Sequence, residues 1–315
     1  MMQRVLLLGG NGFIGSHLID AFLRASFDVT VLDVNPEQFR KPNPNVHYYV
    51  GDWRDLELLQ LILQGSDIII HLVSSTVPVS SNSRILNDAE TNLIGTLQLV
   101  ELMQQYQKTK LLFFSSGGTV YGEPVQSPTP ETHTIQPINA YGLLKATIEN
   151  YLLWYQRSSI VEPIILRPAN IYGIRQNFQN NQGVIAHFLY KILLNQPLEL
   201  WGTGQEVRDF INVQDVAHLL VSLCQQPWAS GVWNVGSGDG VSIISLINLI
   251  EKITQKKMPL SYKQNISFGI REIVLDRTAI YQHNHWEPTI GLEQGIHEQW
   301  NWLQQLYQEN PGLFE

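Results

Sequence analysis

A glycine-rich turn near the start of the chain limits the possible folds more than any other feature of the sequence. Residues 4–8 form an apolar segment of strand length, Gly9-Gly10-Asn11-Gly12-Phe13-Ile14-Gly15 follows, and residues 12–26 carry apolar side chains at helical spacing. Glycines at positions 9, 12 and 15 permit a sharp turn, a close approach of the backbone to a pyrophosphate, and tight packing of the helix on the strand. The free N–H groups of the helix would face the phosphates. The turn therefore predicts the first strand and helix of a dinucleotide-binding sheet.

A carboxylate follows at the position where such a sheet needs one. Asp33 directly follows a second apolar segment, about 20 residues after the glycines, and would accept hydrogen bonds from an adenosine ribose. It would repel a 2′-phosphate, so NAD is favoured over NADP. Asp52 has two interpretations, as a residue that faces the adenine and as a solvated turn residue before Arg54. The expected cofactor-binding residues are Gly9, Gly12, Phe13, Ile14, Gly15, Asp33, Asp52, Trp53, Leu72, Tyr141 and Lys145.

Apolar strands and helical segments alternate through the first half of the chain, which indicates parallel strands joined by crossover helices. Continuous apolar runs at residues 68–70 and 111–114 suit strands that are covered on both faces. The expected fold is α/β, a Rossmann-type doubly wound parallel sheet. Strands are predicted at residues 4–8, 28–32, 46–50, 67–72, 110–115 and 163–167, and helices at 12–26, 56–64, 89–106 and 141–155.

After Arg167 the pattern changes to shorter, interrupted pieces, which predict a smaller, discontinuous α/β domain for the substrate. We assign residues 1–173 and about 207–236 to the NAD-binding domain, and about 174–206 and 237–315 to the substrate domain. Further helices are expected at 184–194, 213–226 and 243–254, and strands at 198–200, 207–211 and 232–235.

Composition and charge argue against several classes of protein. The formal net charge of −8 disfavours nucleic acid or an anionic membrane surface as a partner. The single cysteine, Cys224, excludes an internal disulfide and suits a reducing cytoplasm. The apolar run at the N-terminus is too short for a signal peptide or a membrane span. We therefore expect a cytoplasmic protein. No metal is expected, because His71 lacks partners at metal-ligand spacing.

Tyr141 and Lys145 lie four residues apart in a predicted helix, so their side chains share one face. An unperturbed phenol has a pKa near 10 and is only about 0.1% ionised at pH 7. A neighbouring ammonium group lowers that pKa by roughly 1 to 3 units, and a positive nicotinamide ring acts in the same direction. The pair could therefore act as a base at neutral pH. Taken alone, the spacing is more often that of an aromatic ring packed under a surface lysine.

A set of motifs in a fixed order runs through nearly the whole chain. They are the turn at 9–15, Asp33, Asn92, Gly95 and Thr96, residues 115–122, Tyr141 and Lys145, and residues 166–173, 208–211 and 234–238. In these motifs the chain resembles the extended short-chain dehydrogenase/reductase family, in particular its nucleotide-sugar epimerases and dehydratases. The resemblance implies an enzyme in which Tyr141 takes a hydroxyl proton, Lys145 holds the nicotinamide ribose, and NAD takes hydride from the same sugar carbon.

One position departs from the pattern of the family. Gly117 stands where similar epimerases carry a serine, and dehydratases a threonine, whose hydroxyl bonds the reacting oxygen. Ser116 and Thr119 are the neighbouring hydroxyls that could take this role, and they complete the expected catalytic set with Tyr141 and Lys145. Gly118 and Thr119 replace the Asp-Glu pair of dehydratases, and Thr119 also replaces the glutamate of decarboxylases. Epimerisation is therefore the predicted reaction.

The predicted reaction is epimerisation at C4 of a UDP-hexose or a close relative, through a 4-keto intermediate. Two alternatives remain, a nucleotide-sugar reductase or dehydrogenase of the same family and a non-catalytic dinucleotide-binding protein. The resemblance assigns the diphosphate to Asn170, Arg208 and Arg271; without it, Arg208 could form a salt bridge with Asp209 or another carboxylate. It also implies a homodimer built on the helices at 89–106 and 141–155.

Overall fold

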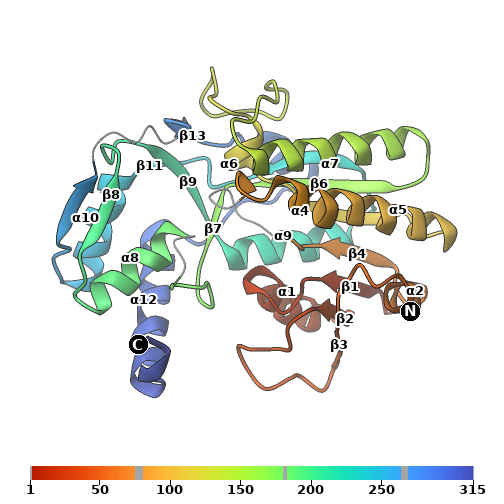
Figure 1. Cartoon of the computed structure of the whole chain (residues 1–315), viewed down its shortest axis with the longest axis horizontal. Coiled ribbons are helices and arrows are strands. Elements are labelled where there is room, and N and C mark those ends of the chain that lie inside the picture. Colours follow the sequence, from red (N-terminus) through yellow and green to blue (C-terminus); the bar gives the residue numbers. More distant parts are fainter. Residues whose placement is uncertain (1, 75–80, 180–182, 264–268, 315) are drawn as a thin grey trace. The chain divides into compact units, whose positions relative to one another are not determined.

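The chain divides into two units in the computed structural model, which describes residues 2–74, 81–179, 183–263 and 269–314 (Figure 1). The first unit holds Met1–Tyr121, Thr134–Arg167 and Ala217–Trp233, and the second holds Gly122–His133, Pro168–Val216 and Asn234–Glu315. Within the described ranges no helix has both the length and the apolar composition needed to cross a membrane.

Seven strands form the sheet of the first unit, and the pairings from β6 to β3 are all parallel. The order β10-β6-β5-β4-β1-β2-β3 reverses direction between β1 and β4, so the carboxyl ends of these two strands mark the position where doubly wound sheets bind ligands. The predicted Rossmann-type sheet is confirmed. Its strands are β1 (Arg4–Leu8), β2 (Asp28–Asp33), β3 (Val46–Val50), β4 (Ile68–His71), β5 (Lys110–Phe114), β6 (Glu162–Pro168) and β10 (Gly231–Val235).

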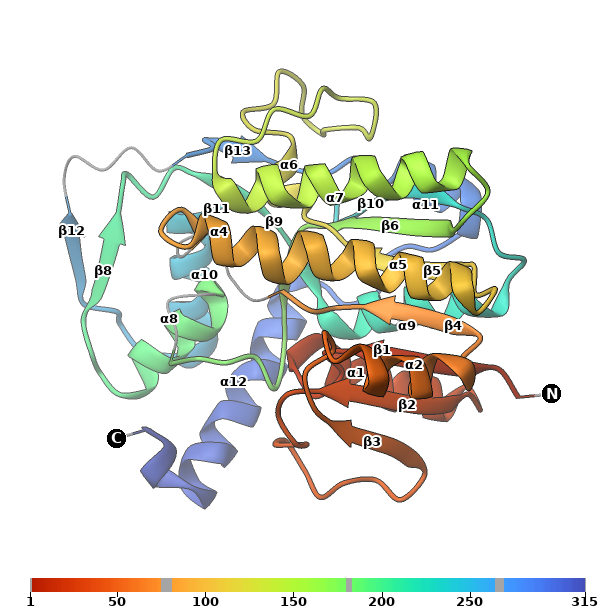
Figure 2. The same ribbon diagram turned by 45° about the vertical axis from the view of Figure 1, so that its right-hand side comes forward.

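Helices cover both faces of this sheet. α2 (Leu56–Gln64), α5 (Gly95–Gln105) and α7 (Ala140–Arg157) share one apolar core with strand side chains such as Leu6 and Ile69. α1 (Phe13–Arg24) connects β1 to β2 in the opposite direction along the sheet, so a right-handed crossover places it on the other face. Figures 1 and 2 both show α5 and α7 lying side by side over the sheet.

The start of α7 is set by its capping residue and by a glycine. Asn139 is the N-cap, and its side chain accepts a hydrogen bond from Gly142 N at 2.8 Å. A Cβ on Gly142 would lie only 2.5 Å from the Thr119 carbonyl oxygen, so glycine allows the first turn of α7 to pack against the short helix α6 (Gly117–Val120). Tyr141 is therefore held close to the turn that follows β5.

The helix predicted at 89–106 is interrupted. α4 (Ile85–Asp88) continues into wider π-helical turns, η1 (Ala89–Ile94), before α5 begins. Asn92 Nδ2 donates to the Asp88 carbonyl oxygen at 3.3 Å, and Thr96 Oγ1 donates to the Asn92 carbonyl oxygen at 2.5 Å. These side chains compete with the regular backbone hydrogen bonds of an α-helix, and such π-helical segments are frequent at functional sites.

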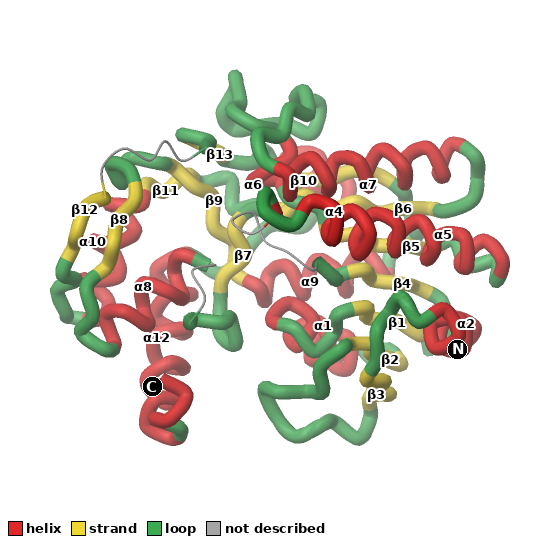
Figure 3. The backbone as a smooth tube through the Cα atoms, in the orientation of Figure 1, coloured by secondary structure: helices red, strands yellow, loops and turns green. Residues whose placement is uncertain are grey.

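The second unit has its own apolar core and two small sheets. α8 (Val184–Leu193), α10 (Ile243–Thr254) and α12 (Leu292–Glu309) contribute side chains to this core, and Figure 3 shows these three helices, in red, in the same part of the second unit. The strand β9 pairs with β7, β11 and β13, and β8 pairs with β12. The remaining elements that the structure describes are β7 (Asn170–Tyr172), β8 (Leu198–Trp201), β9 (Val207–Asn212), α9 (Val213–Gln225), β11 (Gly240–Ser242), β12 (Leu260–Lys263), β13 (Glu272–Ile273), α11 (Thr278–Asn284) and η2 (Pro311–Phe314).

The two units differ at four segments from the domain boundaries that the sequence predicts, which stay a prediction. Residues 122–133, 168–173, 207–216 and 234–236 belong to the second unit, although their sequence pattern suggests the NAD-binding domain. The physical reason is strand pairing: β7 and β9 pair with each other rather than with the large sheet, and Thr129 pairs with Leu275.

A buried ion pair joins α7 to the ends of β5 and β6. Arg167 donates from Nη2 to Glu149 Oε2 at 2.6 Å and from Nη1 to the Tyr121 hydroxyl at 2.9 Å, and Ser115 also donates to Glu149. The side chains of Arg167 and Glu149 are only 6% and 3% exposed. Burial acts to lower the pKa of Arg167, but the hydrogen bond and the charge of Glu149 outweigh it and raise this pKa.

The variant Glu149→Gln keeps the shape of the side chain and removes its charge, which leaves the Arg167 guanidinium buried without a counter-ion. Breaking a buried pair in this way costs about 3–5 kcal/mol. We expect urea denaturation to show a loss of that size in the free energy of unfolding. The matched control is Glu101→Gln on the exposed side of α5, which should change it by less than about 0.5 kcal/mol. Equal effects of the two variants would contradict the importance of the buried pair.

Candidate active site

The glycine-rich turn leads from β1 into α1 with almost no space for side chains. Gly9 has a φ angle of 81°, in the left-handed region that favours glycine. A Cβ on Gly15 would lie 2.4 Å from the Gly10 carbonyl oxygen. Gly12 is the N-cap of α1, and it has no side chain that could bond the first N–H groups of the helix. Phe13 and Ile14 are the first two residues that carry these N–H groups. The N-terminus of α1 can therefore bind an anion such as a pyrophosphate.

Asp33 connects the end of β2 to this turn. Its Oδ2 accepts a hydrogen bond from Asn11 N at 3.0 Å, and its Oδ1 accepts one from Asn35 N at 2.9 Å. Asn11 Nδ2 in turn donates to the Asn35 carbonyl oxygen at 2.7 Å. A carboxylate accepts about four hydrogen bonds, so Asp33 keeps acceptor positions for a ribose. The turn and the carboxylate together fit an adenine dinucleotide.

Leu72 lies where a residue of the cofactor site is expected. Its N–H donates to the Leu8 carbonyl oxygen at 3.0 Å, which extends the pairing of β4 with β1 to the ends of both strands. A Cβ on Gly9 would lie 3.3 Å from Val73, so the residues after β4 pack directly on the glycine turn. Leu72 is therefore at the position where the sheet order reverses.

Asp52 and Trp53 have structural partners instead. Asp52 forms an ion pair with Arg54 at 2.6 Å, whose hydrogen bond lowers the pKa of the carboxyl group. Asp52 is therefore a turn residue paired with Arg54, and its contact with the adenine stays a prediction. The Trp53 ring is buried and packs on His71, with ring centres 4.8 Å apart.

Tyr141 and Lys145 lie one turn apart on α7, and Lys145 Nζ is 5.7 Å from the centre of the Tyr141 ring. Lys145 is only 4% exposed and donates to the Phe114 carbonyl oxygen, at the end of β5, at 2.9 Å. The Tyr141 phenol forms a hydrogen bond with the side chain of Ser74, which follows β4. The predicted pair is therefore brought together at the carboxyl ends of β4 and β5.

The pKa values of Tyr141 and Lys145 are shifted mainly by burial. Burial raises the pKa of Tyr141; the hydrogen bond with Ser74 opposes this effect, and the charge of Asp88 adds to it. Burial also lowers the pKa of Lys145 from 10.5 to about 8, against the charges of Glu149 and Asp88. In the chain alone the pKa of Tyr141 is thus raised rather than lowered as predicted, and Lys145 is not among the groups that shift it. The positive charge of a nicotinamide ring would act to lower it.

His71 lies beneath this site as a neutral, buried side chain. Burial and the charge of Lys145 lower its pKa from 6.5 to about 3, and its Nε2 is 3.0 Å from Thr96 Oγ1. In the part of the chain that the structure describes, no three His, Cys, Asp or Glu side chains form a group that could hold a metal ion.

The two candidate hydroxyls after β5 differ in accessibility. Ser116, the N-cap of α6, is half-buried, and its hydroxyl makes no hydrogen bond to the described residues. Thr119 Oγ1 also lacks a partner among them, but it is enclosed by protein. Ser116 is therefore the hydroxyl that a ligand can reach.

Three further residues belong to this site, and the sequence gives a signal for two of them. Glu149 lies one helical turn beyond Lys145, so the same four-residue spacing that pairs Tyr141 with Lys145 would have found it. Ser74 follows a strand whose carboxyl end faces the ligand. Asp88 acts on both members of the pair, but only the fold brings it near them.

The residues expected to bind the substrate's diphosphate lie in the second unit. The register of β7 with β9 places Asn170 opposite Phe210, two positions after Arg208, so Asn170 and Arg208 share a face. Asn170 Nδ2 donates to the Asp209 carbonyl oxygen at 2.9 Å. Burial lowers the pKa of Arg208, which the nearby carboxylates of Glu206 and Glu123 partly oppose. The register thus places Asn170 and Arg208 on one face of the small sheet, and their binding of a diphosphate stays a prediction.

The possible salt bridge between Arg208 and Asp209 does not form, although both residues are described. The buried Asp209 carboxylate accepts hydrogen bonds from Ser237 N at 2.9 Å and Ser237 Oγ at 2.6 Å, and from Gly238 N and Leu275 N. It holds the turn at 237–238, and Arg208 is left with carbonyl partners, such as Val207 O at 2.8 Å.

The hydrogen bonds of Arg271 to Glu123 and Arg208 are made by its main chain. Its N–H donates to a Glu123 carboxylate oxygen at 2.8 Å, and its carbonyl oxygen lies 3.4 Å from Arg208 Nη1. Its exposed side chain lines a surface cavity of about 300 Å³ together with Glu123 and Glu272.

A model of the NAD dependent epimerase/dehydratase family matches residues 5–236. The chain belongs to this family, and NAD is its cofactor. A putative UDP-glucose 4-epimerase of Methanocaldococcus jannaschii is 34% identical, over 95% of this chain and 98% of that protein. The structure of UDP-glucose 4-epimerase from Thermotoga maritima, with UDP-glucose, gives a TM-score of 0.90 at 31% identity and covers 96% of this chain and 99% of its own. The Thermus thermophilus UDP-glucose 4-epimerase complex with NAD gives 0.87 at 29%, with the same coverage.

The lowered pKa of Lys145 predicts a pH dependence of stability in the protein freed of dinucleotide. Between about pH 8 and pH 10.5 the folded chain holds fewer protons at this site than the unfolded chain, so the free energy of unfolding rises with pH in this window. Compared with Lys145→Met, the native protein should gain about 2 kcal/mol between pH 7.5 and pH 9.5, measured by urea denaturation. The same pH dependence in both proteins would contradict the lowered pKa.

Proposed function

We propose that the chain is an NAD-dependent epimerase of nucleotide-diphosphate sugars, acting at C4 of a UDP-hexose through a 4-keto intermediate. The observation that carries this proposal is the Tyr141–Lys145 pair, whose members bond Ser74 and Phe114 at the carboxyl ends of β4 and β5. The choice of sugar position and nucleotide is supported by the two similar structures, both of them UDP-glucose 4-epimerases.

Each step assigns one task to a residue of this chain. Tyr141 accepts the proton of the C4 hydroxyl, and later returns it to the same oxygen. Lys145, oriented by the Phe114 carbonyl oxygen, binds the nicotinamide ribose and holds positive charge beside the phenol. When bound, NAD supplies a hydride acceptor that gives the hydride back to C4, so the reaction consumes no cofactor. The 4-keto sugar must turn over before the hydride returns, because the product differs only in the face of C4 that carries hydrogen.

Ser116 supplies the hydroxyl that bonds the C4 oxygen in place of the side chain missing at Gly117. Ser116 is half-buried and its hydroxyl has no described partner, whereas Thr119 Oγ1 is enclosed. A donor to this oxygen stabilises the charge that develops on it as the carbon is oxidised.

Arg208 and Asn170 are proposed to hold the diphosphate of the substrate. They share one face of the small sheet, and the engagement of Asp209 with the turn at 237–238 leaves the Arg208 charge without that carboxylate. A guanidinium group can bind phosphate with paired hydrogen bonds. The exposed Arg271 side chain is a further candidate for the same anion.

We also propose that the chain forms a homodimer through α5 and α7. Large apolar side chains on the outer surface of α7 are exposed, among them Leu143 at 59% and Trp154 at 51%. Exposed apolar side chains gathered on one surface are typical of protein interfaces. A monomeric mass in solution at micromolar concentration would contradict this proposal.

Tyr141→Phe should lower kcat by at least about a hundredfold, because the ring remains and only the acid–base group is lost. The assay is interconversion of UDP-glucose and UDP-galactose with no added NAD, followed by product separation. Bound dinucleotide should be retained, and Tyr151→Phe, an exposed tyrosine of the same helix, should keep full activity. Unchanged turnover in Tyr141→Phe would overturn the catalytic assignment. Activity that requires stoichiometric NAD(P)H would favour a reductase or dehydrogenase instead.

Ser116→Ala should lower kcat by about a hundredfold, the usual effect of removing one donor to a developing oxyanion. Thr119→Val, which removes an enclosed hydroxyl of similar shape, should stay within about threefold of the native protein. Steady-state kinetics with the same sugars distinguishes the two residues. The reverse order of effects would assign the role to Thr119.

A further inference from the structure

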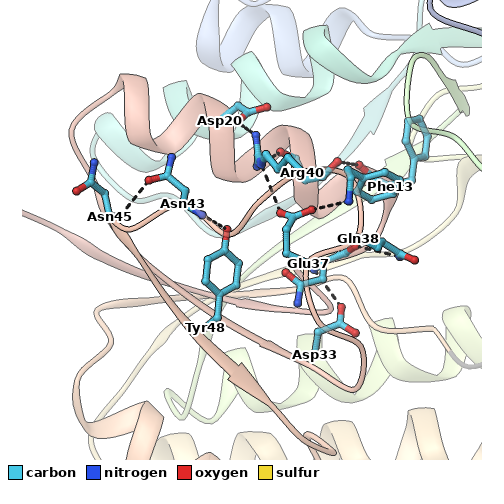
Figure 4. Close-up of polar contacts among 12 residues, drawn as sticks. Phe13, Asp20, Asp33, Glu37, Gln38, Arg40, Asn43, Asn45 and Tyr48 are labelled. Carbon is cyan, nitrogen blue, oxygen red and sulfur yellow. Dashed lines mark hydrogen bonds and ion pairs between the residues drawn. The ribbon is translucent and has the colours of Figure 1, made fainter. Parts of the chain in front are cut away.

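The segment that follows Asp33 folds back over the glycine-rich turn and the first half of α1. Gln38 Nε2 donates to the Asn11 carbonyl oxygen at 3.4 Å. Arg40 donates from Nη2 to the Ser16 carbonyl oxygen at 3.2 Å and from Nη1 to Asp20. Figure 4 shows these contacts around the end of β2. The segment thus lies at the part of the molecule where Asp33 would meet the adenosine ribose.

Glu37 is an unusual residue in this segment, because its charged side chain is 0% exposed. Its Oε1 accepts a hydrogen bond from Phe39 N at 2.9 Å, and its Oε2 lies 3.4 Å from Arg40 Nε. Neither Glu37 Oε2 nor Arg40 Nε makes a hydrogen bond to any residue that the structure describes. Burying a carboxylate costs free energy unless it is paired, so the charge of Arg40 is what retains Glu37 here.

Arg40 is the basic residue of this segment whose position resembles that of an NADP enzyme, where an arginine near the end of the second strand accepts the 2′-phosphate. Here its guanidinium is already bound by Asp20 and Glu37 and by a main-chain oxygen of α1. Asp33 adds a third carboxylate beside the same turn. A 2′-phosphate would therefore meet net negative charge and no free guanidinium.

We propose that Glu37 is a second determinant of the preference for NAD over NADP, acting by neutralising Arg40. Asp33 accepts the hydrogen bonds of the ribose, and Glu37 keeps the Arg40 guanidinium from accepting a phosphate. The proposal concerns dinucleotide selection and holds whichever sugar the enzyme converts.

Titration of the variant Glu37→Gln with NADH and NADPH tests this proposal in protein freed of bound dinucleotide. The readout is energy transfer from tryptophan to the reduced nicotinamide, and the quantity compared is the ratio of the Kd for NADPH to the Kd for NADH. We expect this ratio to fall by about tenfold or more, because one buried charge that opposes the phosphate is removed. The control Glu57→Gln, in the exposed first turn of α2, should leave it within about twofold.

An unchanged ratio in folded Glu37→Gln would overturn the proposal, and so would equal weakening of both affinities, which indicates a purely structural role. The double variant Glu37→Gln/Arg40→Met should lose the gained affinity for NADPH, and retention of that gain would exclude Arg40 as the phosphate partner. Arg40→Met alone gives an independent test if Glu37→Gln does not fold. It leaves Glu37 without its cation and should raise the ratio, whereas a lower or unchanged ratio would overturn the proposal.

Discussion

The buried carboxylate of Glu149 is the interaction on which the reacting end of the first unit depends. It binds Arg167 at the end of β6 and Ser115 at the end of β5, and its charge acts on Lys145 one turn earlier on α7. One negative charge therefore fixes α7 against two strands and opposes the loss of a proton from the lysine. A neutral residue at position 149 would leave the buried Arg167 guanidinium and the buried Lys145 ammonium group without this negative charge.

The large sheet could be predicted from the sequence because its signals are local. The glycine turn, the apolar runs and the carboxylate at Asp33 each lie within a few residues of the element they define, and strand pairing confirms them. The division into units could not be predicted in the same way. β7 and β9 have the same apolar character as strands of the large sheet, and only long-range pairing shows that they belong to another sheet. The π-helical turns depend on side-chain contacts of Asn92 and Thr96, which periodicity does not show.

In the candidate site, too, the features that depend on long-range contacts could not be predicted from the sequence. The four-residue spacing brings Tyr141 and Lys145 together, but the direction of the Tyr141 pKa depends on how deeply the helix is buried. The partner of Asp209 shows why the alternative salt bridge between Arg208 and Asp209 could not be judged from the sequence. Arg208 precedes Asp209 directly, yet neighbours on a strand point to opposite faces, so the carboxylate turns toward Ser237 instead. Opposite charges that are adjacent in a strand are poor evidence for a salt bridge.

The interrupted path of the chain has a consequence for how the protein is made. β6 ends at Pro168, but its outer neighbour β10 begins only at Gly231. During synthesis, the backbone groups along that side of β6 stay unpaired while the ribosome adds the intervening residues. An apolar strand in this state is a template for pairing with other nascent chains. If the ribosome stalls between the end of β6 and the start of β10, the unpaired side of β6 is therefore where this protein would aggregate.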